Sequence, residues 1–151
     1  MLRKALGLIP HALALFIAVI FGDSLRYKFA DHPKTETIFG ILNDWAGTLG
    51  APGLFSHTGL FSQYVIGSAE LIALALLVAG IVPALRFLQG LGALLALFIM
   101  TGAVSFHLFT PLGTDPNKDG GGLFVAACLV WLASLTLVIM RRNGLAGLLR
   151  R

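Results

Sequence analysis

Charged residues are scarce in this chain of 151 residues. They make up 12% of the sequence, whereas hydrophobic residues make up 57%. A soluble domain usually has about a quarter of its residues charged. This composition excludes an ordinary soluble enzyme or binding domain and indicates a membrane protein.

Cysteine is almost absent, because Cys128 is the only one in the chain. A single cysteine excludes an intrachain disulfide and a Cys-x-x-Cys redox pair. Cys128 lies in an apolar run, where a thiol behaves as a small buried hydrophobe. Any redox role would therefore need a bound cofactor, a quinone or the thiols of a partner.

Long apolar runs are the most prominent feature that the sequence does have. Four of them approach the roughly 20 residues that span a bilayer as a helix. They cover residues 5–22, with a possible extension to residue 29, and residues 63–83, 87–111 and 122–140. The sequence thus predicts an all-α integral membrane protein, a four-transmembrane-helix bundle that forms one domain over residues 1–151.

The charges are distributed unevenly between the ends of these predicted spans. An even number of spans places both termini on one side, and that side carries only basic residues: Arg3, Lys4, Arg86, Arg141, Arg142, Arg150 and Arg151. The positive-inside rule then predicts that both termini lie in the cytoplasm, and we expect the membrane to be a bacterial inner membrane. We expect these residues to contact anionic membrane lipids and not nucleic acid.

The outer segment, residues 30–62, is too long to be a simple turn. Pro33 suits a first helical turn, and apolar residues recur at helical spacing after it: Ile38, Leu42, Trp45 and Leu49. This pattern predicts a short amphipathic helix lying on the outer surface. We expect Phe55 and Phe61, farther along the segment, to anchor it at the membrane interface.

Glu70 is a lone carboxylate in the second apolar run. A charge inside a membrane costs several kcal/mol unless it is paired, so it marks a candidate functional site. At about 1.5 Å rise per residue, Glu70 lies roughly 10 Å and His107 roughly 6 Å below the outer helix ends. If the first helix continues past Gly22, Arg26 or Lys28 could reach the same level. The sequence leaves open whether Glu70 makes a structural ion pair or binds a ligand.

The residue spacing supports convergence of these side chains on one pocket in the outer half of the bundle. Small residues lead to the histidine along one helix face: Ala93, Ala96, Met100, Ala103 and His107. Gly67 lies one turn from Glu70 on its helix, and small residues on both faces allow close packing. The pocket candidates are therefore Glu70, His107, Lys28, Arg26 and Gly67.

Two metal or cofactor sites can also be considered. Asp115, Asn117 and Asp119 match the opening of a calcium loop, but Ala126 stands where the bidentate glutamate belongs. The alternative is a tight turn shaped by aspartate side chains. Haem ligation by His11 and His107 within one chain is not expected, because they lie on the order of 20 Å apart. His32 and His57 have no second ligand at a fixed spacing, and we expect both to face solvent.

Two short stretches resemble the DoxX-like superfamily of four-helix membrane proteins. They are Phe21-Gly-Asp-Ser-Leu-Arg-Tyr-Lys-Phe and Tyr64-Val-Ile-Gly-Ser-Ala-Glu-Leu, the second with a G-x-x-E-L pattern. The resemblance implies that Lys28 and Glu70 are paired membrane charges and that Gly67 is the packing glycine beside them. It also implies a role in quinone-linked oxidation, in thiol and oxidative-stress systems, or as a chaperone of other membrane proteins.

These observations leave three functions to compare. The first is an accessory component of a membrane redox or quinone-linked system; if the chain were an enzyme, it would be a quinone-linked oxidoreductase. The second is a non-catalytic assembly subunit that docks on another membrane protein or a second copy, through the outer segment and through seams such as Ala75/Ala79 and Gly92/Ala96. The third, a small-solute transporter, lacks the paired Gly/Pro helix breaks that such proteins show. We favour the first.

Overall fold

The structure, a computed structural model, describes residues 2–148 and is helical throughout, with no strand in that range. Its helices are α1 (Leu2–Phe29), α2 (Pro33–Thr48), α3 (Gln63–Ala79), the 3-10 helix η1 (Pro83–Leu85), α4 (Arg86–Phe109) and α5 (Gly122–Leu148). Arg150 and Arg151 of the predicted basic terminus lie outside the described residues. The all-helical prediction is confirmed.

Three helical stretches are long and apolar enough to cross a bilayer: Gly7–Phe29, Pro83–Phe109 and Gly122–Gly147. Their exposed apolar side chains include Val19, Phe98 and Leu132, which suits contact with lipid. The chain is thus an integral membrane protein. α3 is also apolar but has only 17 residues, because the helix ends at Gly80 and the chain turns before Pro83.

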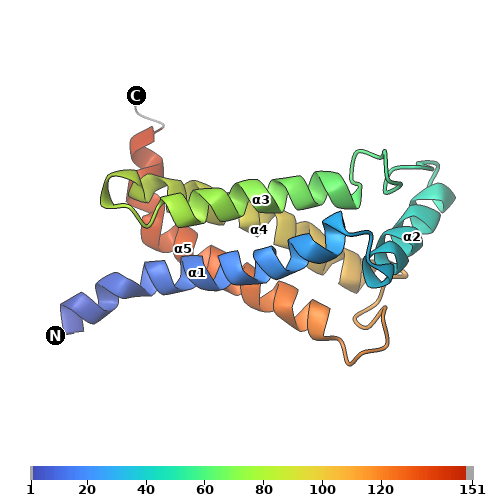
Figure 1. Ribbon diagram of the computed structural model, residues 1–151, viewed down its shortest axis with the longest axis horizontal. Coiled ribbons are helices and arrows are strands. Elements are labelled where there is room, and N and C mark those ends of the chain that lie inside the picture. The colour runs from blue at the N-terminus through green and yellow to red at the C-terminus, as the bar shows by residue number, and fades with distance from the viewer. Residues whose placement is uncertain (1, 149–151) are drawn as a thin grey trace.

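The long helices α1, α3, α4 and α5 lie side by side (Figure 1). α4 packs against α3 and α5, and α1 packs against the same two helices. The predicted small-residue face of α4 points inward, with Ala93, Ala96 and His107 buried. Gly92 lies against α3 so closely that a Cβ there would come within 2.9 Å of the Ala73 carbonyl oxygen. The predicted docking role of the Gly92/Ala96 seam is therefore wrong, because that seam is occupied within the chain.

α2 crosses one end of the long helices, which we call the capped end (Figure 1). The other end, where α1 begins and α5 finishes, carries Arg86, Arg141 and Arg142, and we call it the basic end. The chain enters α2 through His32, whose Nδ1 accepts the Lys34 backbone N–H at 3.2 Å and so caps the helix. His32 therefore has a structural contact that its sequence context did not predict.

The helix predicted in the outer segment is confirmed, but its apolar face does not lie on a membrane surface. Leu42 and Ala46 are buried together with Phe55 and Leu112, and Phe106 of α4 packs against this cluster. Phe55 is buried, and its ring packs edge-on against the ring of Phe106. The prediction that Phe55 anchors the segment at the membrane interface is therefore wrong. Phe61 remains exposed. The cap thus has a small apolar core of its own.

Candidate ligand pocket

A cavity of about 780 Å³ lies at the capped end. All five α-helices contribute to it, and most of the side chains that line it are apolar, such as Ile20, Phe39 and Ala126. The polar lining includes Lys28, Glu70 and His107. A volume of this size, with few polar groups among apolar walls, is typical of a site for a small organic ligand.

Glu70 lies on α3 and is only 2% exposed. Its Oε1 is 3.1 Å from Nζ of Lys28, and Lys28 Nζ also donates to Ser24 Oγ. Lys28 reaches this position because α1 continues without a break to Phe29. The ion pair that the sequence left open is therefore present.

The ion pair uses only one of the two carboxylate oxygens. Glu70 Oε2 is buried and has no hydrogen-bond partner among the described residues. An unpaired buried acceptor costs about 1–3 kcal/mol, more when it is charged. Since Glu70 lines the cavity, a ligand that donates a hydrogen bond to Oε2 would recover this free energy.

Gly67 is close to the ion pair but does not line the cavity. A Cβ at this position would lie 3.3 Å from Cζ of Phe29 and 3.5 Å from Cβ of Lys28. The missing side chain lets the end of α1 approach α3 closely. Gly67 therefore contributes through helix packing and not as a pocket residue, in line with the role implied by the resemblance.

His107 lies in the last turn of α4 and is 5% exposed. Its Nδ1 is 2.6 Å from the Gly113 carbonyl oxygen, in the loop that follows α4. A carbonyl can only accept, so Nδ1 carries a hydrogen, and in a neutral ring Nε2 would then be the acceptor. Figure 1 shows how the helix ends gather here, and the structure brings His107 and Glu70 to one cavity, as predicted.

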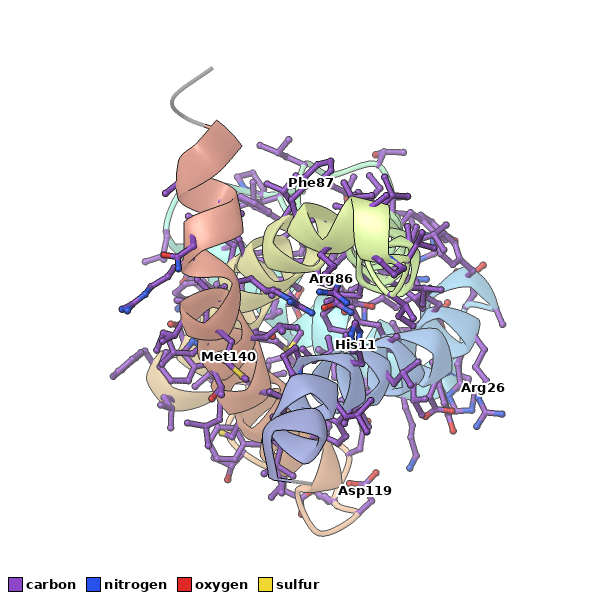
Figure 2. The ribbon with its side chains drawn as sticks, turned by 90° about the vertical axis from the view of Figure 1, so that its left-hand side faces the viewer. His11, Arg26, Arg86, Phe87, Asp119 and Met140 are labelled. Carbon is purple, nitrogen blue, oxygen red and sulfur yellow. The ribbon has the colours of Figure 1, made fainter. Side chains whose placement is uncertain are left out.

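Arg26 does not join this pocket. Its Nε is 2.8 Å from Oδ1 of Asp23, its side chain is exposed, and its guanidinium lies over the Tyr27 ring. Figure 2 shows it at the periphery, directed away from the other helices. The reason is helical geometry: residues two apart point about 200° away from each other, so Arg26 faces outward when Lys28 faces Glu70.

The Asp115 loop is held by its own backbone. Asp115 Oδ1 accepts the Asp119 N–H at 2.9 Å and Oδ2 accepts the Gly120 N–H at 3.1 Å. These hydrogen bonds, the Asp119 N–H first, hold the pKa of Asp115 below its usual value. Asp119 in turn pairs with Lys34 of α2 at 2.7 Å and raises the pKa of Lys34. Asn117 and Asp119 also line the cavity, and calcium binding by this loop stays a prediction.

A second polar cluster, at the basic end, was not predicted. Gln89 of α4 is fully buried; its Oε1 accepts from Nε and Nη2 of Arg141 at 3.0 and 2.5 Å. Its Nε2 is 3.0 Å from Nδ1 of His11, and the charges of Arg86 and Arg141 also act on His11. Figure 2 looks onto this end, with His11 and Arg86 near the middle of the view. A lone amide in an apolar helix was the signal available in the sequence.

The orientations in this cluster follow from donor and acceptor types. A guanidinium can only donate, so the Gln89 oxygen faces Arg141 and its amide nitrogen faces His11. Nδ1 of His11 therefore accepts, and the ring carries its hydrogen on Nε2. The cluster ties α1, α4 and α5 together.

Compared with protein-family models, with curated proteins and with solved structures, the chain shows no match. Its function is therefore inferred from the geometry of its own residues. The cavity at the capped end has mostly apolar walls, and its lining includes His107 and Glu70, whose Oε2 is buried without a hydrogen-bond partner among the described residues. Such a site suits an amphiphilic molecule whose polar head donates hydrogen bonds.

Proposed function

We propose that this chain is a DoxX-like inner-membrane protein that serves as an accessory component of a quinone-linked redox system and binds a quinol at the capped end. The observation that carries the proposal is that Glu70, with its unpartnered Oε2, and His107 line the same largely apolar cavity. A quinol has two hydroxyl donors on an apolar ring, which match this arrangement.

The same chemistry favours the reduced form of the ligand. A quinone carries only carbonyl acceptors at these positions, so it would face Glu70 Oε2 and His107 Nε2 without a donor. When the quinol is oxidised, two protons and two electrons leave it. Glu70 and His107 would accept the protons, and the electrons would pass to a redox partner, because the chain has no cysteine pair.

An isoprenoid tail would need a way out of the cavity. Phe98 of α4 and Leu123 of α5 line the cavity, and their side chains are also exposed on the lipid-facing surface. The cavity thus reaches the surface of the described chain near these two apolar side chains. This supports a ligand that partitions in the bilayer and enters from the side.

The proposal includes four membrane-spanning helices with both termini in the cytoplasm. α3 covers about 25 Å at 1.5 Å per residue, and the turn and η1 that follow add to its length. The arginines of the basic end would face the cytoplasm, and the acids around α2 would face the other side. The cavity would then lie in the outer half of the membrane.

The test is the lipid content of the purified full-length chain. After extraction in mild detergent, mass spectrometry should find about one quinol or quinone per chain, and Glu70→Gln should retain at least ten-fold less. Asp44→Asn is the matched control, because Asp44 is an exposed acid on α2 outside the cavity. Absence of quinone from the wild-type chain, or equal retention by Glu70→Gln, would refute the proposal.

A second candidate function, a non-catalytic assembly subunit, is favoured by one observation. Leu49 and Leu60, in the outer segment, are 66% and 70% exposed. Exposed leucines outside the membrane helices suit a protein interface. The same purification separates the candidates, since a stoichiometric membrane-protein partner without a bound quinol would support assembly.

A further inference from the structure

Three ligand-type side chains from different parts of the outer segment meet on the surface of the cap. Asp31 lies in the turn after α1, Glu36 in the first turn of α2, and His57 in the loop before α3. One ligand atom from each lies within 4.8 Å of the others. Their meeting is a result of the fold: the chain turns back after α2 and places His57 beside Glu36.

Gln63 gives an independent reason to expect a ligand beside these three side chains. It is 1% exposed and lines a cavity of about 210 Å³ together with Glu36 and His57. Its Nε2 donates to the Lys28 carbonyl at 2.9 Å and to Asp31 Oδ1 at 2.6 Å. Both neighbours can only accept, so the amide orientation is determined and Oε1 is left buried without a partner.

Asn43 repeats this observation from α2. It lines the same cavity, and its Oδ1 is also buried without a hydrogen-bond partner among the described residues. Two unpaired amide oxygens in one small cavity are unusual, because buried polar atoms are nearly always satisfied. Oxygen acceptors gathered beside two carboxylates and an imidazole suit a cation.

Asp31 and Glu36 have no ion-pair partner among the described side chains. Among residues 7–147, the ion pairs are Arg26–Asp23, Lys28–Glu70 and Lys34–Asp119, and neither Asp31 nor Glu36 takes part. Two carboxylates this close repel each other. A divalent cation would neutralise both.

Tyr64 holds two of the three ligands in place. Its hydroxyl donates to Asp31 Oδ1, and its ring packs edge-on against the His57 ring at 5.5 Å between centroids. Hydrogen-bonded carboxylates and positioned imidazoles are typical of the groups that surround metal ligands. Both hydrogen bonds to Asp31 use Oδ1, so among the described residues Oδ2 is the oxygen available to an ion.

We propose that Asp31, Glu36 and His57, with the amide oxygen of Gln63 as a further donor, bind a divalent first-row transition-metal ion such as Zn²⁺. Imidazole and carboxylate ligands suit such ions, at about 2.0–2.2 Å from each donor. Two ligands of a tetrahedral ion would then be about 3.4 Å apart. The three ligand atoms lie within 4.8 Å of one another, so their exposed side chains would rotate to bind the ion. The ion would join the end of α1, α2 and the loop before α3.

The test is a Zn²⁺ titration of the full-length chain in detergent after treatment with a chelator. Calorimetry should show about one site per chain, and Glu36→Gln or His57→Ala should weaken binding ten-fold or more. Asp44→Asn is the matched control for charge, because it removes an exposed acid from the same helix. Its affinity should equal that of the wild type.

Two further measurements test whether His57 binds the metal ion. Co²⁺ in place of Zn²⁺ should give visible absorption bands that disappear in His57→Ala. Zn²⁺ should raise the unfolding temperature of the wild type and of Asp44→Asn, but not that of His57→Ala. Circular dichroism checks that each variant folds. If the wild type shows no saturable site, or if His57→Ala binds Zn²⁺ as the wild type does, the proposal is wrong.

Discussion

At the scale of single residues, each buried ionisable group at the capped end has a specific neighbour. Lys28 forms an ion pair with one carboxylate oxygen of Glu70, and His107 Nδ1 donates a hydrogen bond to the Gly113 carbonyl oxygen. Glu70 Oε2 has no hydrogen-bond partner among the described residues. This oxygen is therefore the position that the site can offer to a hydrogen-bond donor.

Lys28→Met tests how much the Lys28–Glu70 ion pair contributes to the free energy of unfolding. It leaves the Glu70 carboxylate buried without its cation, so we expect a loss of about 3–5 kcal/mol in the free energy of unfolding. The double variant Lys28→Met/Glu70→Leu should recover most of this loss, because replacement of both charges removes the desolvation cost. Reversible unfolding in mixed detergent micelles measures both values.

Arg26→Met is the matched control for that experiment. It breaks an exposed ion pair with Asp23 on the same helix, which is worth about 0–1 kcal/mol. Equal losses for Lys28→Met and Arg26→Met would show that Lys28 does not stabilise a buried charge.

At the scale of helices, glycine decides how closely α3 and α4 approach. Gly92 lies against the α3 backbone at Ala73 and Leu77, whereas a Cβ at Gly102, farther along α4, would meet no atom closer than 3.9 Å. Both glycines reduce helix propensity by about 1 kcal/mol relative to alanine. Only the first has a packing reason to be there.

The pair Gly92→Ala and Gly102→Ala should therefore shift stability in opposite directions. Gly92→Ala forces α3 and α4 apart and should cost about 1–3 kcal/mol, since the contacting atoms include α3 backbone. Gly102→Ala should stabilise the chain by about 0.5–1 kcal/mol. Thermal unfolding in one detergent compares them, and a stabilising Gly92→Ala would contradict the observed contact.

At the scale of the whole molecule, polar contacts tie the helices at both ends. The Lys28–Glu70 pair joins α1 to α3 at the capped end, and the Gln89 cluster joins α1, α4 and α5 at the basic end. Between them the core consists of small and aliphatic residues such as Ala14, Ala93 and Leu137. Apolar contacts alone specify helix register weakly in lipid, and the polar ties add that specificity.

Gln89→Leu should loosen the basic end. The change leaves Arg141 without its acceptor and His11 without its donor, so we expect a loss of about 1–3 kcal/mol in the free energy of unfolding. Thr101→Val is the control, because it removes the exposed hydrogen bond from Trp131 that also links α4 to α5. A larger effect for Thr101→Val than for Gln89→Leu would contradict the structural role of the cluster.

Composition and periodicity alone determined the membrane class, the helical fold and the helix in the outer segment, because these depend on hydrophobicity and on helical spacing. The choice of Lys28 over Arg26 needed the actual rotation of α1 against α3. The tertiary structure alone also decided the burial of Phe55 under α2 and the meeting of Asp31, Glu36 and His57. Such contacts depend on how distant segments pack, and local sequence patterns carry no information about that.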